Sequence, residues 1–149
     1  MRLVVQRVKE ASCTVDEKIT GQIDQGFMVL VGINVDDNRD IVYKMANKLA
    51  KLRVFDDDAG KMNLSLFDVG GSILSISQFT LYADCKKGNR PSFVNAMKGE
   101  DAKVLYDYFN CCLKDLGLKV ETGVFGGDMA IKLWNDGPVT IIMDSKDIL

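Results

Sequence analysis

Apolar residues recur along the chain with two different spacings, which predict strands near both ends and helices between them. Residues 2–9 and 11–24 alternate apolar and polar side chains, which is typical of a strand followed by a hairpin. The continuous apolar run at 27–35 predicts a buried central strand. Residues 72–83 form a second strongly strand-like run, and residues 118–144 predict two or three further strands with glycines between them.

Two segments carry the helical spacing instead. Apolar side chains over residues 39–52 fall on one stripe, and Asp and Asn residues just before it can cap the helix. A second helix is predicted from about Glu100 to Leu116, ending at Gly117, a residue type common after a helix. Its expected buried face consists of Val104, Leu105, Tyr108, Phe109, Cys112, Leu113 and Leu116. The order of elements predicts one α/β domain over residues 1–149, with a mixed sheet and helices covering one side.

Composition narrows the class of protein. The chain has 149 residues, of which 47% are hydrophobic, and this fits one compact domain with a full core. No apolar stretch is long enough for a membrane span, and no signal-peptide pattern begins the chain, so we expect a cytoplasmic protein. The net charge of −2 argues against binding a long DNA duplex, but it permits binding a short single-stranded end.

The chain contains no histidine, which excludes whole classes of catalytic site. Ser-His-Asp triads, Cys-His pairs and histidine-based metal sites are ruled out, and we expect neither a metal nor another cofactor. The four cysteines lack metal-ligand spacing, so reduced thiols are the simplest interpretation. Cys85, which precedes two lysines, has the best position of the four for a reactive thiol, but we expect no catalytic role for it.

A glycine-rich segment, "GVFGGDM" at 123–129, allows two interpretations. It can form a bulge or tight bend between strands. It can also bring the backbone close to a flat ligand, with Phe125 and Met129 as apolar walls that suit a nucleobase.

A basic cluster follows the strand-like run at 72–83. Lys86, Lys87 and Arg90 surround a glycine in "KKGNRP". Such a cluster is usually a solvated loop, but directly after a core strand it can also steer a phosphate backbone.

The segment "SQFTL" at 77–81 combines hydroxyl and amide side chains at the end of that same run. Ser77 or Thr80 could be a nucleophile, but no partner base is visible. The backbone N–H groups of Phe79 and Thr80 could instead donate to an oxyanion. From composition alone, a structural role is favoured.

The segment "NDGPVT" at 135–140 places a proline between two strand-like runs. Pro138 removes a backbone N–H that a regular hairpin would use. Either the proline blunts a strand edge, or this rigid corner has a function.

Taken together, these segments resemble the D-aminoacyl-tRNA deacylases from end to end. The matching stretches are "MRLVVQRVKEA", "SQFTL", "KKGNRPSF", "GVFGGDM" and "NDGPVT", in the expected order. "SQFTL" and "NDGPVT" match the two signature motifs of that family. A related animal branch has Pro-Gln-Ala-Thr-Leu in place of the first motif, and this chain does not.

The resemblance implies a homodimer with a largely antiparallel, barrel-like arrangement of β layers. It also implies hydrolysis of the ester between a D-amino acid and the 3′-terminal adenosine of tRNA, with partial admission of glycine. Catalysis would use the backbone donors of Phe79 and Thr80, with Ser77 and Gln78 shaping the pocket and the ribose 2′-OH assisting. Phe125 and Met129 would line the adenine site.

In the family, the Gly-Pro bond of the second motif is cis and enters the active site of the partner subunit. Here that bond joins Gly137 and Pro138, within a motif that continues to Val139 and Thr140. Two parallel carbonyl oxygens would fix the amino group of the substrate and leave no space for an L side chain. Arg7 resembles the arginine that braces this motif.

Charge suggests that Lys86, Lys87 and Arg90 help to hold the acceptor end of tRNA. Two rival functions remain open: a different hydrolase or thiol enzyme that uses Cys85 or Thr80, and a non-catalytic module that binds tRNA ends.

Overall fold

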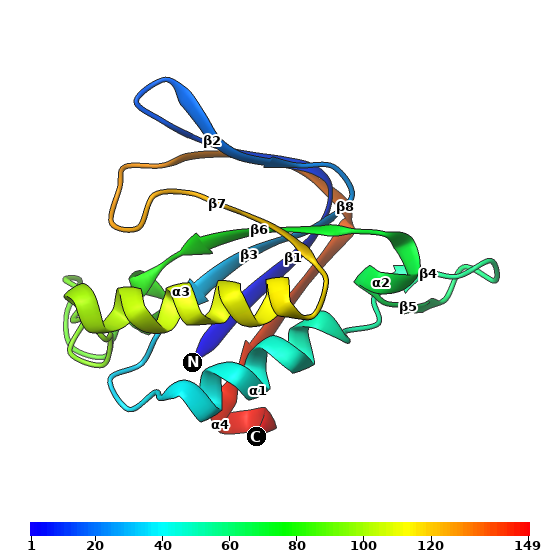
Figure 1. Ribbon diagram of the computed structural model, residues 1–149. Coiled ribbons are helices and arrows are strands. Elements are labelled where there is room, and N and C mark those ends of the chain that lie inside the picture. The colour runs from blue at the N-terminus through cyan, green and yellow to red at the C-terminus, as the bar shows by residue number, and fades with distance from the viewer.

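The alternating and helical segments form a curved sheet with helices packed on one face (Figure 1). The computed structural model describes residues 1–149. Its elements are β1 (Arg2–Val15), β2 (Lys18–Ile23), β3 (Gly26–Gly32), α1 (Arg39–Ala50), β4 (Phe55–Asp56), β5 (Met62–Leu64), α2 (Leu66–Val69), β6 (Ser72–Ser77), the 3₁₀ turn η1 (Phe79–Tyr82), α3 (Gly99–Asp115), β7 (Lys119–Thr122), β8 (Ala130–Asp144) and α4 (Ser145–Ile148).

Strand β1 organises the sheet because it pairs along both edges. Its first half pairs with β3 and its second half with β2, while β8 runs antiparallel along the other edge. β6 and β7 continue the sheet beyond β3 as parallel neighbours. The predicted mixed α/β architecture is therefore confirmed.

The sheet curls until its two ends, β2 and β7, almost meet (Figure 1). A Cβ atom on Gly21 of β2 would lie 2.5 Å from the carbonyl oxygen of Thr122 in β7. Only a residue without a side chain permits this approach. The result is a nearly closed, barrel-like sheet.

Two apolar clusters fill the two faces of the sheet. A cluster of 24 buried residues lies mainly between the sheet and helices α1 and α3. A smaller cluster fills the inside of the curled half, and its members are Val8, Ala11, Cys13, Ile23, Met28, Leu74 and Ile76. Strand alternation divides the side chains, since Phe27 and Val29 face the helices and Met28 faces the inside.

Both predicted helices are present, with a different buried face on the second. α1 begins after Asn38, whose side chain accepts a hydrogen bond from the backbone N–H of Ile41. In α3, Val104 is exposed, contrary to the sequence-based expectation, and Tyr106 is buried instead. The phenol of Tyr106 is accommodated because it has a buried hydrogen-bond partner, which a hydrophobicity pattern does not reveal.

The run predicted as one strand over residues 72–83 is divided in the structure. β6 ends at Ser77, and the chain turns into η1 at Phe79. The backbone N–H of Gln78 still donates to the Val31 carbonyl at 2.8 Å, so the turn starts beside the end of β3.

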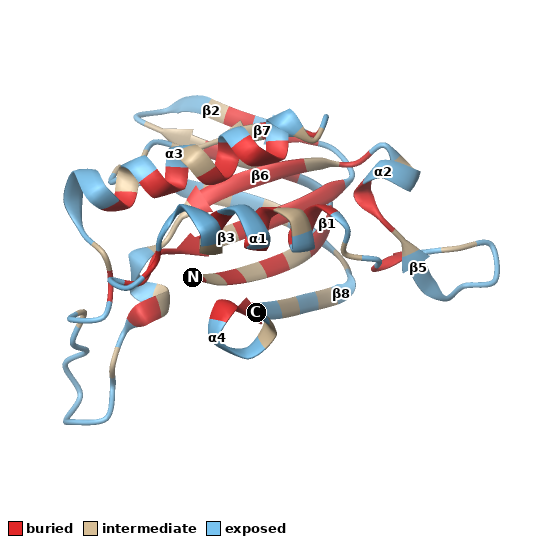
Figure 2. Cartoon of the chain, turned by 60° about the horizontal axis from the view of Figure 1, so that its bottom comes forward, coloured by how far each residue is buried: buried red, intermediate tan, exposed pale blue.

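The tail, predicted to contain two or three strands, contains two, β7 and β8, and β8 runs through the Gly-Pro step instead of ending at it. β8 is continuous from Ala130 to Asp144, but its register with β1 is interrupted. Between the pairs Gln6–Thr140 and Val8–Asn135, Arg7 alone faces residues 136–139, which bulge from the ladder. Figure 2 shows that β8 is mostly exposed or intermediate, while the inner strands are buried.

None of the helices combines the length and apolar character that crossing a membrane would require. All four cysteines are free thiols, as the sequence predicted.

Candidate active site

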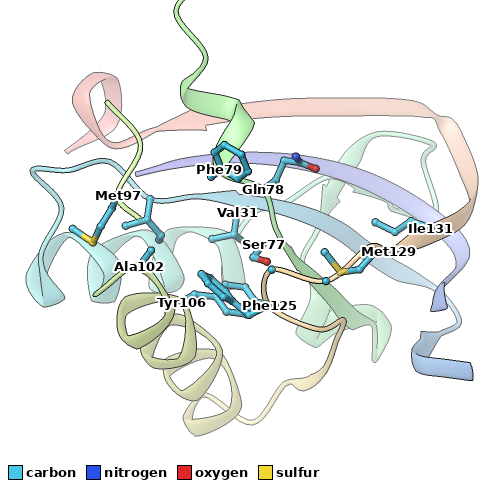
Figure 3. Close-up of a pocket in the computed structure, with 13 residues that line it drawn as sticks. Val31, Ser77, Gln78, Phe79, Met97, Ala102, Tyr106, Phe125, Met129 and Ile131 are labelled. Atoms are coloured by element: carbon cyan, nitrogen blue, oxygen red, sulfur yellow. The ribbon is translucent and has the colours of Figure 1, made fainter. Parts of the chain in front are cut away.

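A cavity of about 270 Å³ lies where the ends of β3 and β6 meet the start of α3 and the glycine-rich loop (Figure 3). It is lined by Val31, Ile33, Ser77, Gln78, Phe79, Met97, Ala102, Tyr106, Phe125, Gly126, Gly127, Met129 and Ile131. The ends of adjacent parallel strands are a common place for ligand sites in α/β proteins. The fold thus joins two segments that the sequence singled out separately, 77–79 and 125–129.

The end of β6 forms one wall of the cavity. Ser77, Gln78 and Phe79 all line it, and Figure 3 shows Gln78 and Phe79 close together there. The side-chain amide of Gln78 donates to Thr80 Oγ1 at 2.5 Å. Thr80 itself is exposed and does not line the cavity, so its hydroxyl lies outside the enclosed space.

The turn after β6 leaves backbone donors near this wall. Phe79 and Thr80 are the first residues of η1, and the first N–H groups of a helical turn have no carbonyl partner within it. Neither N–H donates to a backbone carbonyl in the surrounding loops. These groups can therefore stabilise a negatively charged oxygen.

The opposite wall consists of two aromatic rings, Tyr106 from α3 and Phe125 from the glycine-rich loop (Figure 3). Their centroids are 5.7 Å apart and their planes are tilted by 43°. The Tyr106 hydroxyl donates to the backbone carbonyl of Ser75 at 2.8 Å. Burial raises the pKa of Tyr106, so its phenol stays neutral. The sequence-based interpretation missed Tyr106, although its helical spacing from Ala102 and Phe109 was a usable signal.

The glycine-rich loop bends sharply and passes close to the side chains of Cys13 and Met129. Gly126 has a φ of +74°, which favours glycine, and a Cβ on Gly123 would lie 3.0 Å from Cys13 Sγ and overlap Met129. The tight path brings the side chains of Phe125 and Met129 to the cavity. The bend between strands is therefore confirmed, whereas the close approach to a flat ligand stays a prediction.

The Gly-Pro segment lies elsewhere. Gly137 and Pro138 are exposed on β8, their peptide bond is cis, and neither lines the cavity. Thr140, which pairs with Gln6, is also exposed, and Val139 packs against the helix-side cluster.

Arg7 holds the Gly-Pro segment from the helix-facing side of the sheet. The residue is 6% exposed, and its Nε donates to the carbonyl of Asp136 at 3.0 Å. One terminal nitrogen donates to the Val54 carbonyl at 2.7 Å and contacts the carboxylate of Asp56 at 3.3 Å. Arg7 thus fixes the residue before Gly137 to the protein core.

The basic cluster is also separate from the cavity. Lys86, Lys87 and Arg90 are exposed in the loop between η1 and α3, and none of them lines the cavity. Lys86 borders a different cleft, together with Cys85 and Arg2. The exposed thiol of Cys85 therefore faces no part of the cavity.

The chemistry available in the cavity is limited. Tyr106 is its only titratable lining residue, and no group of three or more His, Cys, Asp or Glu side chains is placed to hold a metal ion. The cavity therefore offers apolar and aromatic contacts, amide and hydroxyl groups, and nearby backbone donors. These features suit the binding of a flat ring and the stabilisation of a negatively charged oxygen, and they provide no strong side-chain base.

Comparison with known proteins places this arrangement in a family. Residues 4–144 match the family described as D-Tyr-tRNA(Tyr) deacylase. A D-aminoacyl-tRNA deacylase from Thermus aquaticus is 55% identical over 147 residues, covering 99% of this chain and 97% of that protein. One from Bacillus pumilus is 56% identical over 147 residues, with 99% and 100% coverage.

Solved structures agree on the fold. A protein described as c-Myc DNA Unwinding Element Binding Protein superposes with a TM-score of 0.90 at 40% identity, covering 97% of this chain and 98% of that one. A probable eukaryotic D-amino acid tRNA deacylase superposes with a TM-score of 0.85 at 17% identity, covering 95% and 97%. The second likeness bears on the fold alone.

Proposed function

Because the chain belongs to the D-aminoacyl-tRNA deacylase family and is a hydrolase, we propose that it cleaves the ester between a D-amino acid and the 3′-terminal adenosine of tRNA. This reaction would remove D-amino acids from tRNA before translation, as chiral proofreading in the cytoplasm. The observation that carries the proposal is the single cavity that joins the end of β6 to the glycine-rich loop.

The terminal adenosine occupies the aromatic side of the cavity in this proposal. Phe125 and Met129 line it and offer the apolar surface that an unstacked base requires. Phe125 is held against Tyr106, so the ring is in place before the ligand arrives. The adenine site is therefore assigned to this wall.

The ester lies against the opposite wall, where the backbone N–H groups of Phe79 and Thr80 receive the developing oxyanion. One such donor typically lowers the barrier by about 2.7–4 kcal/mol. Ser77 and Gln78 shape the pocket, and the neighbouring ribose 2′-OH positions or activates the water. The exposed position of the Thr80 hydroxyl supports a role for its backbone rather than a nucleophilic side chain.

Selection of the D-configuration comes from a second subunit. Gly137 and Pro138 are exposed and lie outside the cavity of their own chain, while Arg7 anchors the preceding residue. We assign the segment 137–140 to the active site of the partner in a homodimer. Its carbonyl oxygens hold the substrate amino group and exclude an L side chain, so selectivity arises by rejection. Glycine, which has no side chain, is partly admitted.

A partly exposed apolar row supports the homodimer. Leu30, Val4 and Ile142 are aligned across β3, β1 and β8 on the face away from the helices. Ile142 is 69% exposed, and it lies only a few residues from Pro138 along the same strand. Exposed apolar surface of this kind is typical of protein interfaces. We place the partner subunit over this row.

The exposed loop that carries Lys86, Lys87 and Arg90 is the proposed contact for the phosphates of the tRNA acceptor end. The loop connects η1 to α3, both of which contribute to the cavity. Its charges therefore lie on the segment that joins the two walls.

The test compares D-tyrosyl-tRNA with L-tyrosyl-tRNA, incubated separately with the purified protein and EDTA. Rapid loss of the D ester alone is the expected result. Loss of both esters would leave an esterase and remove the chiral assignment. If neither decays faster than in buffer, the protein is a binding module, and binding to tRNA ends and to duplex DNA should then be measured, because a solved relative is described as DNA-binding.

A further inference from the structure

A second apolar cleft, of about 380 Å³, adjoins the cavity. Its lining residues are Phe79, Phe93, Met97, Lys98, Gly99 and Phe125. We refer to it as the aromatic slot. Phe79, Met97 and Phe125 line both spaces, so the slot continues the cavity directly.

The slot is partly open and is built from aromatic rings. Phe79 is 51% exposed, and its ring meets Phe93 nearly edge to face, with centroids 5.1 Å apart and planes at 69°. Lys98 is exposed at the slot. The slot therefore presents ring surface beside a positive charge, which is the combination that binds single-stranded nucleic acid.

The segment that carries Phe93 is held in place by backbone hydrogen bonds. Ser92 and Asp84 exchange two of them, at 2.7 and 2.9 Å. On the other side of Phe93, the N–H of Ala96 donates to the Phe93 carbonyl at 3.1 Å, and that of Met97 donates to Ile33 at 2.9 Å. The slot is therefore preformed, and a ligand does not have to order a free loop.

We propose that the aromatic slot binds the base of the nucleotide that precedes the terminal adenosine of the tRNA, with Lys98 near the phosphate between the two nucleotides. This inference rests on the proposed function, which places the adenosine in the cavity. The single-stranded end must leave the cavity, and the slot is an apolar path that shares a wall with it. Stacking on aromatic rings accepts any base, so this contact adds affinity without adding sequence preference.

The test uses two minimal substrates, the D-tyrosyl ester of adenosine and that of the dinucleotide cytidylyl-adenosine. Wild-type protein should have a higher kcat/KM for the dinucleotide ester. Phe93→Ala should lower the dinucleotide value about tenfold and leave the adenosine value within about twofold, since stacking acts only on the additional base. Val94→Ala is the matched control, because Val94 is 70% exposed and does not line the slot.

Two further variants sharpen the result. Phe93→Leu keeps apolar bulk and should lie between wild type and Phe93→Ala, and it replaces the alanine variant if that protein does not fold. Lys98→Gln should reduce the salt dependence of the dinucleotide reaction only.

Equal losses on both substrates would overturn the proposal, because Phe93 would then act only by supporting Phe79. Unchanged kinetics on both would also overturn it. If the wild-type protein cleaves neither ester nor D-tyrosyl-tRNA, the proposed function itself fails. That outcome is distinguishable because it requires no variant.

Discussion

The cavity and the Gly-Pro segment differ in how much of their environment one chain provides. The cavity is enclosed by β3, β6, α3 and the glycine-rich loop of a single chain, and its rings support one another. Residues 136–139 instead bulge from an edge strand, with Gly137 and Pro138 exposed. Nevertheless, the buried Arg7 fixes this bulge by donating to the carbonyl of Asp136.

The proposed function treats the cavity and the Gly-Pro segment as two halves of one site, which a single chain holds in separate places. A segment that is rigidly anchored and yet faces solvent is suited to contact another molecule, whereas the cavity is suited to receive a small part of a substrate. If both belong to one active site, the second molecule has to be another copy of this chain.

The strongest test mixes two inactive variants, one damaged in each half. Gly137→Ala places a side chain at a φ of +131°, with its Cβ 3.0 Å from Val139. Ala102→Phe fills the cavity, which the buried Ala102 lines. Each variant alone should lose roughly a hundredfold or more in deacylation rate, because small misplacements at a reacting centre have effects of this size.

Co-expressed in equal amounts, the two variants should recover about one quarter of wild-type activity. Half of the dimers are then mixed, and each mixed dimer contains one site built from two intact halves. If the Gly-Pro segment served the cavity of its own chain, no mixture would be active. The readout is the rate on D-tyrosyl-tRNA, with dimer composition measured by native mass spectrometry.

The second test separates the subunits. Ile142→Lys places a charge at the exposed end of the apolar row formed with Val4 and Leu30. We expect a shift from dimer to monomer in sedimentation velocity and a loss of at least about tenfold in activity at low protein concentration, because a charge that must be buried opposes association. Ile19→Lys is the matched control, since Ile19 is 61% exposed on β2, outside the row. A monomer that retained full D-selective activity would contradict the cross-subunit assignment.

The sequence predicted the residues of the cavity better than it predicted the structure around the Gly-Pro segment. "SQFTL" contains hydroxyl and amide side chains, and "GVFGGDM" contains glycines beside two large apolar side chains, so the sequence identified both segments as candidate sites. The strand and helix periods also placed both segments near the ends of elements. In the structure the two segments meet in the cavity. Their meeting depends on strand order, a long-range property that local periodicity does not contain. Tyr106 was missed because the predicted stripe placed Val104 and Tyr108 in the buried face of the helix instead.

The sequence predicted less of the structure of β8. The Gly-Pro step suggested a break between two strands, whereas the structure keeps one strand and absorbs the step as a bulge opposite Arg7. Only three-dimensional pairing shows that the arginine is buried against the Asp136 carbonyl. The residue pattern of a segment does not distinguish a surface that faces solvent from one that faces a partner subunit. The prediction of a homodimer therefore rested on the resemblance to the family.

The third test weakens the anchor of the Gly-Pro segment without touching the cavity. Arg7→Lys keeps the charge but loses the planar fork that serves the carbonyls of Asp136 and Val54 together. We expect the free energy of unfolding to fall by about 1–3 kcal/mol, the usual effect of unpaired buried hydrogen-bonding groups. The ratio of D to L hydrolysis should fall several-fold as the segment loosens.

Urea unfolding and paired rates on D- and L-tyrosyl-tRNA measure the two effects. Arg53→Lys is a suitable control, because Arg53 is exposed and bonds only to Asn63. A variant with reduced stability but an unchanged D to L ratio would limit Arg7 to a structural role.

The smallest effect is expected on the cavity side, at Tyr106. Tyr106→Phe removes the hydrogen bond to the Ser75 carbonyl and should lower the free energy of unfolding by about 1 kcal/mol. Activity should stay within about twofold of wild type, because the ring that faces Phe125 is kept.

Burial raises the pKa of Tyr106 above its ordinary value of about 10, so the phenol remains protonated up to pH 9 and contributes no titration below it. Wild type and variant should therefore have the same pH–rate profile between about pH 6 and 9, and any inflection there should follow the α-amino group of the substrate, which titrates near pH 8 in free form. An inflection that disappeared in Tyr106→Phe would instead identify the phenol as an acid or base, and the cavity would then supply a proton-transfer group of its own.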